Sequence, residues 1–200
     1  MEGVWVETTT TKRADARKNY DTLVAVARKH LAERGVSTSL EAIAREAGVG
    51  AGTLYRHFPD RDHLVFAALN AQGEQLRAAA EAIRDAAPSD ARLERWLDEL
   101  EVYLTTYQGL PESIAHALDH GECSPLAISC REILSITDEF LLTAREHGTV
   151  RETVSAHDLF HATLTLAWLS SRCPEQPGEP PRFDGLRAML RHGYLTSPQN

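Results

Sequence analysis

The 200-residue sequence lacks the features of a secreted or membrane-bound protein. It has only three cysteines, an odd number whose spacing matches no metal motif, so we expect reduced intracellular thiols and no disulfide framework. No apolar run approaches the length of a membrane span, and the first residues lack the long hydrophobic run of a secretory signal. We therefore expect a cytoplasmic protein with no membrane partner.

Motifs of enzyme chemistry are also missing. The sequence contains no nucleophile elbow, phosphate loop or metal-binding motif, so we expect no enzymatic activity, no catalytic residue, no metal and no other cofactor. His157 and His161 stand four residues apart, and His116, His120 and Cys123 form a looser cluster, but neither group has a full set of metal ligands. Nothing near the cysteines indicates a lowered thiol pKa, so a cysteine sensor is not expected.

A net positive charge is a third absence, because the formal charge is −8. The charge is divided unevenly: residues 12–63 carry ten Lys or Arg and seven Asp or Glu, whereas residues 64–200 carry eleven and twenty. A mildly basic N-terminal part on an acidic body suits a protein that presents one face to phosphates and uses the rest for another task. The alternative is that this uneven division of charge arose by chance, and a DNA-binding motif within residues 12–63 would count against it.

Residues 37–64 predict such a motif, a helix-turn-helix. Two segments of helical apolar periodicity, 40–47 and 51–58, are separated by Gly48-Val49-Gly50, which is too short for a strand but long enough to turn one helix against another. Thr38 and Glu41 fit a capping box at the start of the first helix.

The turn glycines have separate roles in this interpretation. Gly48 can adopt the left-handed conformation that ends a helix. Gly50, Ala51 and Gly52 leave the N-terminus of the second helix nearly bare of side chains, so its backbone amides can approach a phosphate or a groove wall closely.

The segment GTLYRHFP at 52–59, with Arg61 and Leu64 after it and IAREAGV at 43–49 before it, resembles the signature of the TetR (tetracycline-repressor-like) family. The resemblance implies an all-α fold, with an N-terminal three-helix helix-turn-helix DNA-binding domain and a larger helical ligand-binding and dimerisation domain. The expected division is a disordered arm over 1–11, the DNA-binding domain over 12–63 and the ligand-binding and dimerisation domain over 64–200.

The same resemblance implies a sequence-specific DNA-binding transcriptional regulator. We expect a homodimeric repressor that a small hydrophobic or aromatic ligand releases from a palindromic operator. A dimer is expected because one head makes too few contacts for tight specific binding, whereas two recognition helices about 34 Å apart fit successive major grooves. The alternative is a helix-turn-helix protein whose helical body binds a protein partner or acts as an activator without an inducer.

Base recognition is expected from Thr53, through its methyl or hydroxyl group, and from Arg56, whose guanidinium can hold guanine O6 and N7. A phosphate contact is the alternative for Arg56. Contacts to the DNA backbone are expected from bare positions, hydroxyls and basic groups around the recognition helix and at the start of the first helix, some carried over from the family pattern: Thr38, Ser39, Gly50, Ala51, Gly52, Tyr55, His57, Arg61, Lys12, Arg13 and Arg17.

Beyond the head, every clear signal is helical. Aromatic and mixed residues of the body predict a mostly apolar ligand pocket, with plain core packing as the alternative for each of them: Trp96, Tyr103, Tyr107, His116, Phe140, Phe160 and Trp168. The last two amphipathic segments, 156–171 and 183–195, flank a proline-rich loop. The family resemblance implies that they form the dimer interface, with burial inside one subunit as the alternative: Leu159, Thr163, Leu164, Phe183, Leu186, Met189, Leu190 and Tyr194.

Overall fold

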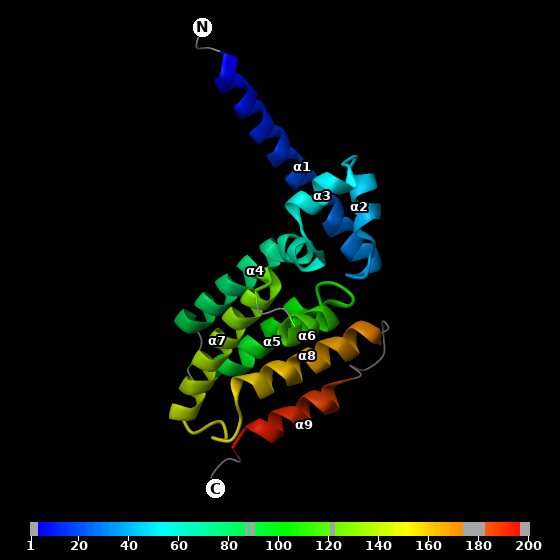
Figure 1. The fold of residues 1–200 in the computed structure, drawn as a ribbon. Helices are drawn as coiled ribbons and strands as arrows, with labels where there is room; N and C mark the ends of the chain where they lie inside the picture. Colours follow the sequence, from blue (N-terminus) through cyan, green and yellow to red (C-terminus); the bar gives the residue numbers. More distant parts are fainter. Residues whose placement is uncertain (1–3, 87, 89–90, 121–122, 174–182, 197–200) are drawn as a thin grey trace.

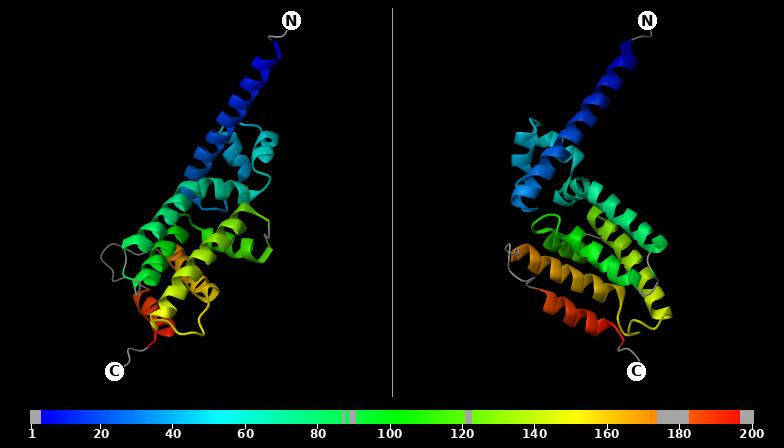
Figure 2. Two further views of the ribbon diagram at one scale, coloured as in Figure 1. Left: turned by 90° about the vertical axis from the view of Figure 1, so that its left-hand side faces the viewer. Right: turned by 180° about the vertical axis from the view of Figure 1, so that it is seen from behind.

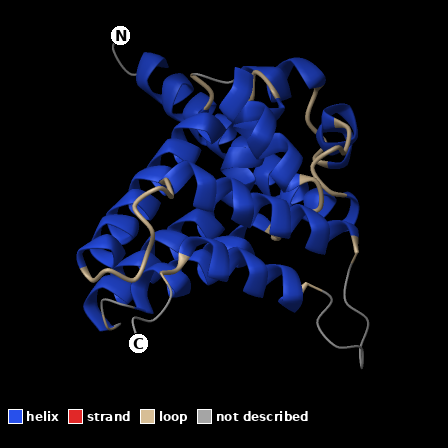
Figure 3. Ribbon diagram, turned by 90° about the horizontal axis from the view of Figure 1, so that it is seen from below, coloured by secondary structure: helices blue, strands red, loops and turns tan. Residues whose placement is uncertain are grey.

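The computed structural model describes residues 4–86, 88, 91–120, 123–173 and 183–196. Within them the chain forms nine α-helices and no strand beyond an isolated bridge between Val150 and Leu195 (Figures 1 and 3). The helices are α1 (Val4–Arg34), α2 (Leu40–Glu46), α3 (Ala51–His57), α4 (Arg61–Ala86), α5 (Arg92–Leu104), α6 (Leu110–His120), α7 (Pro125–Glu146), α8 (Ala156–Arg172) and α9 (Asp184–Tyr194). The all-α prediction is confirmed, and the proline-rich loop lies outside the described residues.

The first helix begins earlier than the sequence predicts. Residues 4–11, expected to be a disordered arm, continue α1, and this part of the helix projects beyond the other helices of the head (Figure 1). The C-terminal half of α1 is fixed by burial of Leu23, Ala27 and Leu31. Adding residues to an existing helix costs much less than nucleating one, so the threonine-rich composition does not end it.

Two separate hydrophobic cores divide the molecule into a head and a body. The head core joins α1, α2 and α3 around buried residues such as Leu23, Ile43, Leu54 and Phe58. The body core joins α4 to α8 around Trp96, and the two views of Figure 2 show these helices packed below the head. The described residues include no helix that is both long and apolar enough to cross a membrane.

Helix α4 belongs to both cores. Leu64 and Ala67 are buried in the head, whereas their neighbours Val65 and Ala68 are buried in the body, because successive residues of a helix face different directions. The end of α1 also reaches the body core through Leu31, and the loop after α1 reaches it through Val36. The head therefore contacts the body through α4 and through the end of α1 with the loop that follows it.

Candidate DNA-binding interface

The first helix of the motif starts one residue later than the sequence predicts. Ser39 is the N-cap of α2, and its Oγ accepts a hydrogen bond from the backbone N–H of Ala42 at 3.2 Å. The expected capping box of Thr38 and Glu41 is wrong, because Thr38 is buried and its Oγ1 lies 3.3 Å from His30 Nδ1. Burial also removes Thr38 from the surface that can reach a phosphate, whereas Ser39 is exposed.

The turn and recognition helix follow the predicted geometry. Gly48 has a φ of +67°, the left-handed conformation expected after the end of α2. Gly50 is the N-cap of α3 with no side chain, so the amides of the first turn lack a side-chain cap. Gly50, Ala51 and Gly52 are exposed, and a Cβ added at either glycine would meet nothing within 4 Å. The N-terminus of α3 is therefore open to close approach by DNA.

One face of α3 is held by the head core and the other is free. Leu54 and Phe58 are buried, and the Phe58 ring packs against Tyr20 of α1 with 5.0 Å between centroids. Thr53 is half-buried and Arg56 is exposed, so both can present donors outside the head. His57 is half-buried beside the same Tyr20 ring, at 6.0 Å between centroids.

Tyr55 has a partner that the sequence did not indicate. Its hydroxyl donates a hydrogen bond of 2.7 Å to Glu41 Oε1, and Ser39 Oγ donates one of 2.8 Å to the other carboxylate oxygen. These hydrogen bonds, of which the one from Tyr55 has the largest effect, lower the pKa of Glu41 to about 2. Glu41 thus stays ionised and orients two hydroxyls that were predicted to contact the DNA backbone.

Arg61 lies at the start of α4 and points toward the loop before α2. Its Nη1 donates to the carbonyl oxygens of Val36 and, at 2.6 Å, of Thr38. The structure therefore engages part of this guanidinium inside the protein, where the sequence predicted a phosphate contact.

His30, which no sequence motif indicates, joins α1 to the loop before α2 and to the end of α2. His30 is buried on α1 and its Nε2 lies 2.7 Å from Glu46 Oε2 at the end of α2, while Lys29 Nζ contacts the other oxygen at 2.8 Å. Hydrogen bonds from Lys29 and His30 lower the pKa of Glu46 to about 2. His30 and Glu46 are separated by sixteen positions in the sequence, so no local spacing would have indicated the pair.

The basic residues of α1 lie on its outward part. Arg13 and Arg17 are exposed, and the backbone of Lys12 is helical while its side chain lies outside the described part. The helix continues past them to Val4, so these residues lie within α1 and not in an irregular arm.

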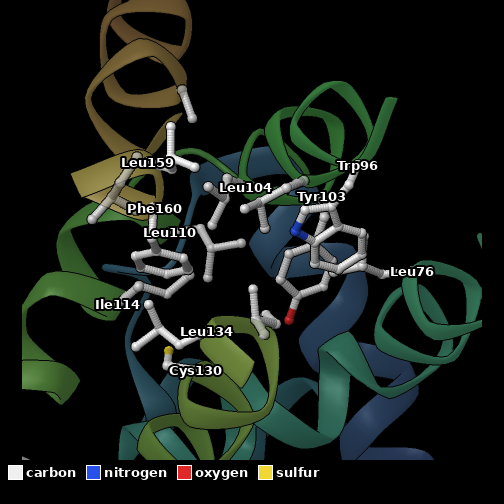
Figure 4. Packing of buried hydrophobic residues seen from close by; sticks show 14 of the residues in the cluster. Leu76, Trp96, Tyr103, Leu104, Leu110, Ile114, Cys130, Leu134, Leu159 and Phe160 are labelled. Atoms are coloured by element: carbon white, nitrogen blue, oxygen red, sulfur yellow. The ribbon is translucent and has the colours of Figure 1, made fainter. Parts of the chain in front are cut away.

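Of the residues predicted to line an apolar ligand pocket, five lie in the packed body core, and His116 lines a cleft between the head and the body. Trp96, Tyr103, Tyr107, Phe140 and Phe160 are buried in the packed body core, part of which is shown in Figure 4. Trp96 Nε1 donates to Thr137 Oγ1 at 2.8 Å, which satisfies its polar group inside the core. The two remaining residues, His116 and Trp168, are exposed, and Trp168 Nε1 donates to Glu112 Oε1 at 2.9 Å.

Four of the residues predicted at the dimer interface face inward. Leu159, Thr163, Leu164 and Tyr194 are buried within the single chain, and the Thr163 hydroxyl donates to the carbonyl of Leu159 at 2.9 Å. Leu159, Leu164 and Tyr194 belong to the body core, which matches the alternative of burial inside one subunit.

The other four predicted interface residues belong to the last helix region and retain exposed surface. Met189 is 72% exposed, whereas Phe183, Leu186 and Leu190 are half-buried. Helix α9 is held to α5 by two ion pairs, Arg187 to Glu101 at 2.6 Å and Arg191 to Asp98 at 3.0 Å.

A recognition helix exposed on a three-helix head, with a long helix leading into an all-helical body, defines a helix-turn-helix DNA-binding regulator. Residues 23–68 match the sequence family described as bacterial regulatory proteins, tetR family, and residues 87–188 match the C-terminal domain of SbtR-like transcriptional regulators. The chain belongs to the TetR family of transcriptional regulators and is a DNA-binding regulator of transcription.

Individual relatives agree with this assignment. An HTH-type transcriptional regulator of Staphylococcus aureus (strain USA300) is 44% identical over 55 residues, which are 27% of this chain and 30% of the relative. The match thus spans about a third of the length of that curated relative.

Solved structures match over nearly the whole chain. The TetR transcriptional regulator SCO0520 from Streptomyces coelicolor is 29% identical, with a TM-score of 0.55 over 88% of this chain and 99% of that one. A TetR-family regulator (ECA1819) from Pectobacterium atrosepticum is 23% identical, with a TM-score of 0.61 over 94% of this chain and 99% of that one, and it supports the fold alone.

Proposed function

We propose that the protein is a homodimeric repressor that binds a palindromic operator through α3 and leaves it when a small molecule binds the body. The observation that carries the proposal is the exposed face of α3, where Thr53 and Arg56 stand beside a glycine-rich helix start while Leu54 and Phe58 anchor the helix. In this proposal the head extends to about residue 63 and the remaining chain serves ligand binding and dimerisation.

Contacts divide into those that specify bases and those that position the head. Arg56 and Thr53 read base edges in the major groove. The open amides at Gly50 to Gly52 and the imidazole of His57 hold phosphates without sequence preference. The hydroxyls of Ser39 and Tyr55 join them by turning away from Glu41, to which each now donates its only hydrogen. Arg13 and Arg17 lie farther along α1 and add phosphate contacts that are sensitive to salt.

The dimer forms through the outer faces of α8 and α9. On α9, Gly185, Met189 and Gly193 are exposed and spaced four residues apart, so they lie along one side of the helix. A Cβ added at either glycine would meet nothing within 4 Å, which leaves room for a helix of a second copy to approach closely. Phe183 and Leu186 border this stripe and extend its apolar surface.

The base-reading role of Arg56 is tested with operator DNA selected from a random library by the full-length protein. We expect Arg56→Ala to lower affinity for the selected site by about 1–3 kcal/mol and to relax the preference at one base position of each half-site. The measurement is fluorescence anisotropy on a set of single-base operator variants.

Arg131→Ala is the matched control, because Arg131 is an exposed arginine on α7 in the body and its removal changes the net charge equally. This variant should keep both affinity and base preference. If Arg56→Ala weakens all operator variants by the same factor, Arg56 contacts phosphate instead. If it has no effect, α3 does not read DNA in the proposed manner.

A further inference from the structure

A cleft of about 880 Å³ lies between the head and the body. Its head side includes Arg34 at the end of α1 and the first residues of α4, and its body side includes the α5–α6 turn, Ser113 of α6 and Arg172 of α8. In Figure 2 the α5–α6 turn lies directly below the end of α1. The volume falls within the range of small-molecule sites.

The cleft borders a direct connection between the two units. The backbone N–H of Val36, in the loop after α1, donates to the carbonyl of Gln108 in the α5–α6 turn at 2.9 Å. The Val36 side chain is buried in the body core, and a Cβ added at Gly109 would lie 3.0 Å from Val36 Cγ2. Val36, Gln108 and Gly109 all line the cleft, so an occupant would touch both partners of this connection.

The loop that carries Val36 leads directly to the DNA-binding helices. Ser39, three residues later, caps α2, and Arg61 binds the carbonyls of Val36 and Thr38 from the start of α4. On the other side, Gly109 immediately precedes α6. Displacing the α5–α6 turn relative to Val36 would therefore shift α2, and with it α3, relative to the body.

The cleft lining carries three arginines and three carboxylates, and Arg34 is the arginine whose charge is available to an acid group, because Arg61 and Arg172 bond to other groups of the protein. Arg34 is exposed and, within the described part of the chain, makes no ion pair. The starts of α4 and α6 and the N-cap of α7, Ser124, also line the cleft, and helix N-termini carry partial positive charge. The acidic residues Asp60 and Glu112 are already bonded, to His63 at 2.7 Å and to Arg172 at 2.9 Å.

The cleft wall also offers an acceptor to a hydrogen-bond donor on an occupant. Asp62 lines the cleft, is half-buried and makes no ion pair within the described part of the chain. Glu112 does not serve in this way, because its Oε1 accepts from both Trp168 and Arg172, and its Oε2 is buried where a molecule in the cleft cannot reach it. A donor on an occupant would therefore meet Asp62.

We propose that this cleft is an effector site for a small organic acid that also carries hydrogen-bond donors, as amino acids and hydroxy acids do. The acid group binds near Arg34, a donor binds the carboxylate of Asp62, and occupancy separates Val36 from Gln108. The regulatory part of this inference rests on the proposed function as a repressor. It places the effector outside the packed aromatic core, which would have to open to admit the hydrophobic ligand expected from the sequence.

The test begins with binding to the full-length protein in the absence of DNA. The probes are the proteinogenic amino acids with citrate, malate, lactate and gluconate, and a second set of uncharged aromatic compounds, toluene, indole and naphthalene, represents the core-pocket alternative. Thermal shift identifies binders and calorimetry gives their Kd. We expect at least one acid of the first set to bind.

Four variants locate the site. Arg34→Gln should weaken the acid at least tenfold, and Ser113→Trp, which fills the cleft, should abolish its binding. Arg131→Gln and Ser135→Trp make the same changes at exposed positions of α7 and should leave Kd unchanged. Equal binding to all variants, binding of aromatic compounds alone, or binding by no probe would each overturn the proposal.

Anisotropy with the selected operator then tests the regulatory role. A saturating amount of the bound acid should reduce operator affinity by a factor within the usual range of allosteric coupling, about 5- to 150-fold. An acid that binds in the cleft and leaves operator affinity unchanged would overturn the effector role. A protein that selects no DNA would overturn the proposed function instead, while calorimetry would still decide whether the cleft binds acids.

Discussion

At the scale of single residues, the guanidinium of Arg61 holds the loop after α1 against the first turn of α4. It donates to two backbone carbonyls, those of Val36 and Thr38. Arg61 is half-buried, so these hydrogen bonds are partly shielded from water. A charged donor to a backbone carbonyl is worth more than a neutral one.

We expect Arg61→Ala to lower the free energy of unfolding by about 1.5–3 kcal/mol, because two carbonyls lose a charged donor. Urea unfolding followed by circular dichroism measures this. Arg45→Ala is the control, since Arg45 is exposed on α2 and its side chain makes no hydrogen bond to that loop within the described part of the chain. It should change stability by less than about 0.5 kcal/mol. If Arg61→Ala is as stable as the control and only weakens DNA binding, the guanidinium serves phosphate contact, as the family pattern implies.

At the scale of elements, two turns meet where the head contacts the body. Gly35 has a φ of +74° and Gly109 a φ of +82°, so both turns need the left-handed conformation. A Cβ at Gly35 would lie only 2.5 Å from the carbonyl oxygen of Gln108. Gly48, in the turn between α2 and α3, has a similar φ of +67° but open space around it.

A comparison of Gly48 with Gly35 distinguishes backbone strain from crowding between the α1–α2 and α5–α6 turns. Gly48→Ala introduces strain alone and should destabilise the protein by about 1–2 kcal/mol. Gly35→Ala adds a clash with backbone and should cost about 1–3 kcal/mol more. Thermal and urea unfolding of both variants provide the comparison. Equal losses would show that the two turns separate easily, which would also weaken the proposed connection between cleft and head.

At the scale of the whole molecule, the proposed dimer must hold two heads at a fixed spacing to read a palindromic operator. The described surface of α9 presents its most exposed large apolar side chain, Met189, beside Gly185 and Gly193. Because small residues allow helices to approach closely, a charge at Met189 would be buried without a partner in the proposed dimer.

We expect Met189→Glu to shift the protein from dimer to monomer at micromolar concentration and to weaken operator binding at least tenfold. Sedimentation velocity measures the first effect and anisotropy the second. Leu142→Glu is the matched control, because Leu142 is 50% exposed on α7 and is not part of the proposed interface. A dimeric Met189→Glu protein would place the interface on another surface.

Much of the head could be predicted from the sequence because its signals are local. The apolar spacing of α2 and α3, the left-handed Gly48 and the bare start of α3 depend on residues within a few positions of one another. The helical pattern of the body is equally local, which is why the predicted segments 156–171 and 183–195 differ from α8 and α9 by about one residue at each end.

What only the tertiary structure decided are the partners of side chains and backbone groups far apart in the chain. The pairing of His30 with Glu46, the direction of Arg61, the inward orientation of Leu159 and Tyr194 and the meeting of Val36 with Gln108 all depend on how helices pack. Periodicity shows that a helix has an apolar face but not whether that face meets its own body or a second chain. The sequence by itself thus determined a helical DNA-binding head and its recognition helix, whereas packing decided which residues hold that head to the body.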